Sequence, residues 1–158
     1  MKRRATTRGS TPIRRILHAT DFSPASRPAF RMALGLARRE RATLLLLLHV
    51  LTPPSPFVPV GGEVPASYLE LLAAARRDAR RRLAALLARA RAAGARTGTR
   101  LVEGGPADEI LKVGRRWHPD LIVIGTHGRG GVRRFLMGSV AEHVVRRASR
   151  PVLTVRSR

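Results

Sequence analysis

Hydrophobic residues in this chain fall into two kinds of segment that alternate along the sequence. Residues 42–51, which include five consecutive leucines, and residues 121–124 are apolar almost without interruption. Such runs are typical of strands covered by helices on both faces, because a strand with one solvated face alternates apolar and polar residues. Between the runs, apolar residues recur every three or four positions, which predicts helices with one buried face.

The pattern predicts five strands and four helices in strict alternation. We expect strands at 13–19, 42–51, 99–103, 121–124 and 151–156, and helices at 24–40, 67–93, 106–117 and 139–148. No hairpin signal separates any two strands, so the sheet should be parallel with helices on both faces. The fold class expected is therefore α/β, a three-layer sandwich in which ligands bind beyond the carboxyl ends of the strands.

Several local signals predict where the helices begin and end. Ser23-Pro24 offers a cap and a first-turn proline for the first helix, and His118-Pro119 should stop the third. Ser67 with Glu70, and Ser139 with Glu142, have the spacing of capping boxes. The segment 52–66 holds five prolines and a glycine pair, so it is either a lid over a site or an inert excursion.

Glycines gather where the fourth strand meets the fourth helix. Gly125 follows the apolar run, three more glycines lie within the next six residues, and Gly138-Ser139 opens the next amphipathic segment. A glycine loop between a strand and a helix start is suited to phosphate binding, since residues without a Cβ let backbone N–H groups approach an anion. The alternative is that the glycines serve only as turn formers.

Composition and charge limit the remaining choices. The chain of 158 residues should hold one domain at 13–158 preceded by a basic, disordered tail at 1–12, and it has no cysteine for disulfides or thiolate metal sites. We expect a cytoplasmic protein without a membrane-spanning segment. The formal charge of +21 is almost entirely arginine and indicates either solvated helix faces or non-specific contact with nucleic acid.

The spacing Gly125-x2-Gly128-x9-Gly138-Ser139 separates this loop from other phosphate-binding motifs. It lacks the Gly-Lys-Ser/Thr of a P-loop and the third glycine of the dinucleotide fingerprint. It resembles the motif G-2x-G-9x-G-[S/T] of the universal stress protein family, in the subgroup associated with ATP binding. The resemblance extends over residues 13–156 and includes Ala19-Thr20-Asp21, His49-Val50 and the Gly104-Gly105-Pro106 turn.

The resemblance implies a Rossmann-like domain with strand order 3-2-1-4-5, and a homodimer that pairs the last strand, Val152 to Val155, of each subunit. It also implies binding of ATP, or of AMP or ADP, together with nucleotide-bound Mg²⁺. The residues that it assigns to this site are Thr20, Asp21, Val50, Gly125, His127, Gly128, Arg129, Gly138, Ser139 and Val140.

The same resemblance assigns each of these positions a role. Asp21, in the turn after Thr20, would lie beside the ribose or the Mg²⁺, and the backbone of Val50 would meet the adenine edge. Gly125 and His127 would line the ribose. The phosphates would be held through backbone N–H groups, with the Ser139 hydroxyl as a further donor, at positions Gly128, Arg129, Gly138, Ser139 and Val140.

Three alternatives stay open at this level. In the first, Asp21 only caps the first helix. In the second, the chain keeps the fold as an interaction protein without a nucleotide, and in the third it acts as a basic protein associated with nucleic acid. No base can be placed beside Asp21, so we expect a nucleotide-binding module in stress response with at most slow hydrolysis and no catalytic residues.

Overall fold

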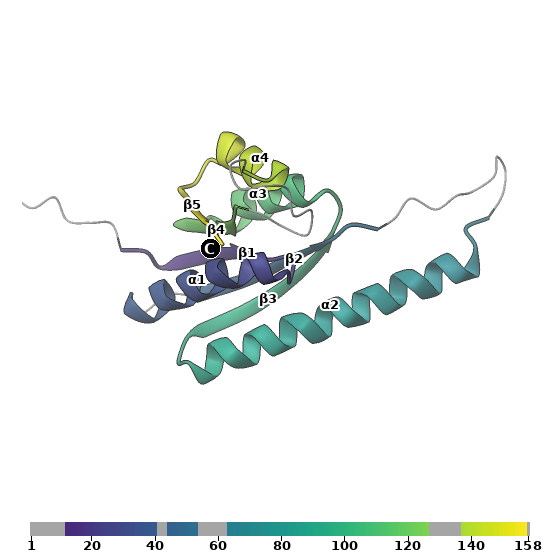
Figure 1. Ribbon diagram of the computed structural model, residues 1–158, viewed down its shortest axis with the longest axis horizontal. Coiled ribbons are helices and arrows are strands. Elements are labelled where there is room, and N and C mark those ends of the chain that lie inside the picture. The colour runs from purple at the N-terminus through teal and green to yellow at the C-terminus, as the bar shows by residue number, and fades with distance from the viewer. Residues whose placement is uncertain (1–11, 41–43, 54–62, 127–136, 158) are drawn as a thin grey trace, which may run out of the picture.

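The computed structural model describes residues 12–40, 44–53, 63–126 and 137–157, which form a three-layer α/β sandwich (Figure 1). Its five strands lie in the order β3-β2-β1-β4-β5, and every neighbouring pair is parallel. This confirms the predicted fold class and strand order. The strands are β1 (Arg15–Ala19), β2 (Leu44–Leu51), β3 (Arg96–Glu103), β4 (Leu121–Gly125) and β5 (Val152–Val155).

The helices cover both faces of the sheet. A short 3₁₀ turn, η1 (Pro24–Ser26), leads into α1 (Arg27–Arg39), and α1 lies with α2 (Ala66–Ala92) on one face. On the other face lie α3 (Pro106–Trp117) and α4 (Ser139–Arg147), as Figure 1 shows. Each connection between two consecutive strands therefore includes a helix that packs on one face of the sheet, as parallel strands require.

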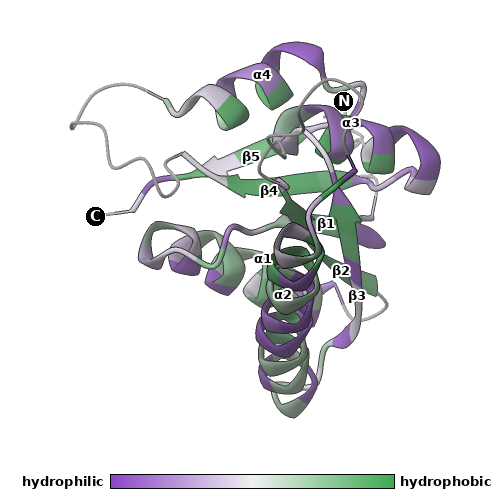
Figure 2. Ribbon diagram, turned by 90° about the vertical axis from the view of Figure 1, so that its right-hand side faces the viewer, coloured by the Kyte–Doolittle hydropathy of each residue, from purple (hydrophilic) through white to green (hydrophobic). Residues whose placement is uncertain are grey.

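The sheet separates two hydrophobic cores. Successive residues of β1 point to opposite faces, so Ile16 packs with α1 and α2 while Leu17 packs with α3 and α4. Both side chains are fully buried, which explains why β1, β2 and β4 read as nearly continuous apolar runs (Figure 2). Each buried side chain of this size stabilises the fold by about 2 kcal/mol relative to leaving it in water.

Several predicted boundaries hold and others do not. Ser23 caps η1, because its hydroxyl accepts a hydrogen bond from the Ser26 amide at 3.2 Å. Strand β3, however, begins at Arg96 and not at Thr99. It is an edge strand whose residues 96–100 are mostly polar, and its pairing with β2 overrides that weak local signal.

Both predicted capping boxes are wrong. The N-cap of α2 is Pro65, so that Ser67 lies inside the helix, and the N-cap of α4 is Gly138, so that Ser139 is its first residue. A serine can accept from a backbone amide two or three residues later only from the cap position. Among the described residues, no side chain caps either helix.

Candidate functional site at the carboxyl edge of the sheet

The carboxyl ends of β2, β1 and β4 lie side by side at one edge of the sheet. The chain leaves β1 for β2 on one side, whereas β4 pairs with β1 on the other side, so the strand order reverses between β1 and β4. In parallel α/β sheets, ligands bind in the crevice that opens at such a switch point. The segments that bound this edge are the turn after β1, the end of β2, and the junction of β4 with α4.

The turn after β1 is held by a dense set of hydrogen bonds. Asp21 Oδ1 accepts from the Ser23 amide at 3.0 Å and from the Ser23 hydroxyl at 2.7 Å. Thr20 Oγ1 accepts from the Phe22 amide at 3.1 Å and lies 3.1 Å from the Ser26 hydroxyl. Asp21 does not act as the helix cap, because Ser23 occupies that position.

Phe22 joins this turn to two other elements. Its φ of 63° lies in the left-handed region, which side chains with a Cβ seldom adopt. Its ring centroid lies 4.3 Å from that of His49 on β2, and the Arg82 guanidinium of α2 lies 5.9 Å from the ring centre. His49 Nδ1 in turn lies 2.8 Å from the carbonyl oxygen of Thr20.

Strand β2 extends past the end of β1. The last residue of β1, Ala19, is opposite Leu48, and the Thr20 amide donates to the Leu48 carbonyl at 2.9 Å. Backbone groups of alternate residues point to the same side of a strand, so those of Val50 face the space beyond the end of β1. The Val50 side chain packs into the core beneath α3 and α4.

The loop between β4 and α4 begins and ends at one point. The Thr126 amide donates to the Val155 carbonyl at 3.0 Å, and the Gly138 amide donates to the Thr126 carbonyl at 2.7 Å. The Gly138 N–H, which the sequence-based prediction assigns to a phosphate, closes the loop in this structure. The amides of Ser139 and Val140 follow at the start of α4, where helix geometry supplies no carbonyl partner.

The structure thus brings seven of the ten predicted site residues to the same edge. They are Thr20, Asp21, Val50, Gly125, Gly138, Ser139 and Val140. The other three, His127, Gly128 and Arg129, lie outside the described residues.

The comparison with known families decides the identity of this fold. The model of the universal stress protein family matches residues 12–156, which is nearly the entire chain. The chain belongs to the universal stress protein family. Universal stress protein MJ0531 of Methanocaldococcus jannaschii is 34% identical over 149 residues, an alignment that covers 94% of this chain and 85% of that protein.

Solved structures of the family superimpose on this chain. Universal stress protein UspA from Lactobacillus plantarum has a TM-score of 0.83 at 26% identity, covering 93% of this chain and 100% of its own. A universal stress protein solved in complex with cAMP has a TM-score of 0.64 at 26% identity, covering 92% of this chain and 98% of its own.

The edge of this universal stress protein also contains charged residues of α2. Arg76 of α2 makes a two-point ion pair with Glu103 at the end of β3, with Nη2 at 2.9 Å from Oε2. Hydrogen bonds from Arg76 hold the pKa of the Glu103 carboxyl below its usual range. Two arginines of α2, Arg76 and Arg82, are therefore not merely solvated but contact residues at this edge.

His18 is a buried polar residue just before the turn. It is 0% exposed, and its Nδ1 lies 3.1 Å from the Val123 carbonyl oxygen. Its Nε2 has no hydrogen-bond partner among the described residues. Burial lowers the pKa of His18 to about 4, so its ring is neutral at pH 7.

Metal binding by side chains alone finds no support at this edge. Within the described ranges, no three His, Cys, Asp or Glu residues converge in a way that could hold a metal ion. A metal at this edge would therefore need further ligands from a bound molecule, as the nucleotide-bound Mg²⁺ of the sequence-based prediction would have.

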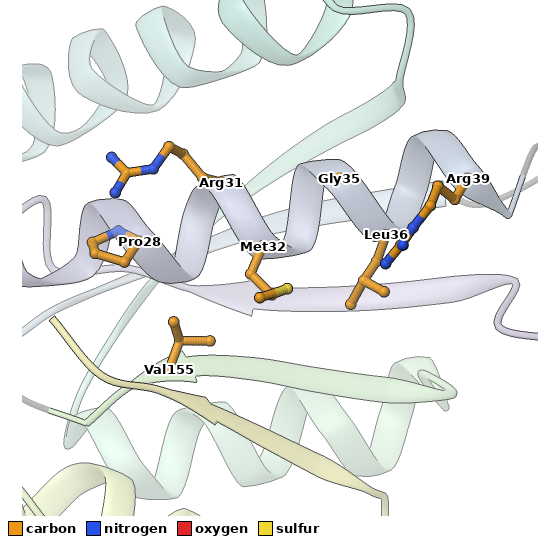
Figure 3. Close-up of a pocket in the computed structure, with 7 residues that line it drawn as sticks. All are labelled: Pro28, Arg31, Met32, Gly35, Leu36, Arg39 and Val155. Atoms are coloured by element: carbon orange, nitrogen blue, oxygen red, sulfur yellow. The ribbon is translucent and has the colours of Figure 1, made fainter. Parts of the chain in front are cut away.

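The structure shows one feature that the sequence did not indicate, a hollow of about 310 Å³ along α1 (Figure 3). Met32 and Leu36 of α1 project toward the strands there, and Val155 at the end of β5 points back toward them (Figure 3). Arg31 and Arg39 lie at its border.

Among the described helices, none is long and apolar enough to span a bilayer.

Proposed function

We propose that this universal stress protein binds an adenine nucleotide at the carboxyl edge of its sheet, with ATP as ligand or, in its place, AMP or ADP. The observation that carries the proposal is the convergence of backbone groups that the sheet and helices do not use. Those of Val50 face the space beyond β1, and the first amides of α4 start beside the end of β4. The cAMP complex of a relative supports the same class of ligand.

The residues present fit such a ligand. An adenine edge needs a donor and an acceptor beside an apolar surface, and the backbone of Val50 at the margin of the core meets this need. A phosphate needs donors at the positive end of a helix, which Ser139 and Val140 supply. Gly138 contributes by its missing side chain, since its N–H already closes the loop.

The remaining roles follow the family assignment. Asp21 lies beside the ribose or a nucleotide-bound Mg²⁺, and Gly125 and His127 line the ribose. Gly128 and Arg129 complete the phosphate site. Phosphoryl transfer to water requires an oriented nucleophile as well as charge stabilisation. We therefore expect a nucleotide-dependent module of stress response with at most slow ATP hydrolysis.

We further propose that the protein acts as a homodimer through β5. This strand lies at the edge of the sheet and pairs with β4 on one side only, and unpaired strand edges favour pairing with a second chain. The hollow beside β5 offers further surface for a second chain. It is lined by Met32, which is exposed, and by Gly35, where a Cβ would meet nothing within 4 Å. A sedimentation experiment that finds only monomers at micromolar concentration and moderate salt would contradict this.

The charge of +21 favours a second, weaker activity, which is non-specific contact with nucleic acid. Retention on DNA should then fall steeply as salt rises, whereas nucleotide binding should change much less. The opposite ranking of the two salt dependences would favour nucleic acid as the principal ligand.

Calorimetry with ATP and Mg²⁺ tests the nucleotide proposal. We expect a dissociation constant in the micromolar range, which corresponds to a binding free energy of about −8 kcal/mol. The variant Gly138→Val should bind about 100-fold more weakly, because a branched side chain at the start of α4 obstructs the phosphate. Gly138 has a φ of −61°, which valine also adopts, so the variant should fold. Unchanged affinity in the folded variant would mean that the site is assigned to the wrong residues.

A further inference from the structure

We propose that Phe22, His49 and Arg82 form a clamp that positions the Asp21 carboxylate for the bound nucleotide and its Mg²⁺. The three side chains come from the turn after β1, from β2 and from α2, and Phe22 contacts both of the others. The role of the clamp rests on the proposed function, because only that function gives Asp21 a ligand. The contacts of the clamp itself are those of the described residues.

The backbone of the turn shows that Phe22 is held from outside. Its φ of 63° is unfavourable for an aromatic residue, and glycine or asparagine would adopt it at lower cost. Residues in such conformations persist where the surrounding structure fixes them, and they gather at ligand sites. What the phenylalanine ring adds to this turn, and what glycine would lack, is packing against the core beneath α1 and α2 together with the contacts to His49 and Arg82.

His49 fixes the first end of the turn. It is 6% exposed, and its Nδ1–H donates to the Thr20 carbonyl oxygen at 2.8 Å, because a carbonyl oxygen can only accept. Its ring lies against Phe22 with the two planes inclined by 35°. One side chain of β2 therefore holds the residue before Asp21 by a hydrogen bond and the residue after it by ring packing.

Arg82 brings α2 to the same turn. It makes an ion pair with Asp78 one turn earlier on the helix, with Nε 2.7 Å from Oδ2, and this pair orients the guanidinium that lies 5.9 Å from the Phe22 ring centre. Arg81 also pairs with Asp78, but of these two arginines Arg82 is the one whose guanidinium lies over the Phe22 ring. Arg81 is thus a matched control for the loss of one arginine from α2.

Asp21 lies between the two held residues, and its own side chain is fixed in turn. Both of its bonds with Ser23 reach the same oxygen, Oδ1, at 3.0 and 2.7 Å. These bonds set the plane of the carboxylate, provided that the backbone between Thr20 and Ser23 keeps its shape. If Phe22 left the left-handed region, the Ser23 amide would turn away from Asp21, and the carboxylate would lose its orientation.

The test compares nucleotide binding with and without Mg²⁺. Phe22→Ala removes the ring but keeps the Cβ that makes the left-handed backbone unfavourable, and Arg82→Ala removes the cation beside the ring. We expect both variants to lose about tenfold in affinity for ATP with Mg²⁺, as is usual when a residue that orients a metal-facing group is lost. Their affinity for ATP in EDTA should change by less than about twofold. Arg81→Ala should match the wild type under both conditions.

A conservative variant of His49 separates its two contacts. His49→Asn can still donate to the Thr20 carbonyl oxygen but has no ring, whereas His49→Leu has neither contact. We expect the asparagine variant to keep part of the Mg²⁺-dependent affinity that the leucine variant loses. Equal losses with and without Mg²⁺, or an equal loss in Arg81→Ala, would overturn the clamp and leave only a structural role.

Amide hydrogen exchange gives a readout that does not need a nucleotide. In Phe22→Ala and Arg82→Ala, the Ser23 amide should exchange faster relative to the amides of β1, and in Arg81→Ala it should not. Exchange that rises uniformly over the sheet, or that stays unchanged at Ser23, would refute the clamp. If the wild type binds no nucleotide, the proposed function fails, and the Ser23 exchange rate still decides whether the clamp exists.

Discussion

The turn after β1 and the start of α4 lie at the same edge of the sheet but differ in how their polar groups are hydrogen-bonded. In the turn, the side chains of Thr20, Asp21, Ser23 and Ser26 donate and accept among themselves and cap η1. At α4, the cap position is Gly138, and among the described residues no side chain accepts from the first amides. The side chains of the turn bond to one another and to nearby amides, whereas we propose that the first amides of α4 are donors for a ligand.

Polar groups near a site therefore differ in their roles, and a polar side chain there does not by itself indicate that it contacts a ligand. A hydroxyl or carboxylate committed to neighbouring amides holds the shape of the site, whereas backbone donors without partners supply the attraction for an anion. The starts of α2 and α3 also lack side-chain caps among the described residues. The start of α4 differs from them because it adjoins the strand-order reversal and the family's glycine motif.

The largest effect that we expect concerns His18, the buried residue that leads into the turn after β1. Its pKa is lowered by burial from 6.5 to about 4, so the unfolded chain takes up a proton at a higher pH than the folded protein does. This contribution to stability is complete above pH 6.5 and is lost as pH falls toward 4, by about 3 kcal/mol in total. Denaturant unfolding across this range measures it.

His18→Leu is the control for that prediction. Leucine has similar bulk and no titrating group, so the fall in unfolding free energy between pH 6.5 and 4 should be smaller by the same amount. An identical pH dependence in the variant and the wild type would show that His18 is not held neutral. The turn would then tolerate a charge that the described contacts do not accommodate.

A second effect separates the two segments by stability. Ser23→Ala removes the cap of η1 and a donor to Asp21, and we expect a loss of about 1 kcal/mol in unfolding free energy. Ser139→Ala should change stability by less than about 0.5 kcal/mol, because Ser139 is the first residue of its helix and not the cap. Equal losses in both variants, measured by chemical denaturation, would remove the contrast.

The smallest effect is on binding at α4. Ser139→Ala removes the hydroxyl but keeps the amide, so affinity for ATP with Mg²⁺ should fall by about threefold to tenfold, the value of one hydrogen bond. Titration calorimetry measures the change. A loss as large as that of Gly138→Val would mean that the hydroxyl, and not the backbone, dominates the phosphate contact.

The sequence predicted those parts of the molecule that depend on local pattern. The apolar runs of β2 and β4 and the helical spacing of α1 and α3 are local, and they specified the alternation from which the parallel sheet follows. The glycine spacing located the β4–α4 junction. The caps predicted for α2 and α4 were wrong, because a serine three residues before a glutamate does not decide where a helix begins.

Contacts between distant residues could not be predicted in the same way. The stack of Phe22 on His49 and the approach of Arg82 join positions far apart in the chain, and no local pattern encodes them. The bond from the Gly138 amide to Thr126 depends on the path of the whole loop. The hollow along α1 is lined by residues of that helix and by Val155 of β5, which are far apart in the sequence.

The most direct test of the central claim is an NMR titration of the amide-labelled protein with ATP and Mg²⁺. We predict the largest changes in amide chemical shift at Asp21, Val50, Ser139 and Val140. These residues are distant in sequence and meet at the carboxyl edge. Amides around Met32 and Gly35, in the hollow along α1, should change little. Saturating changes centred on that hollow, or none anywhere at millimolar ATP, would contradict nucleotide binding at this edge.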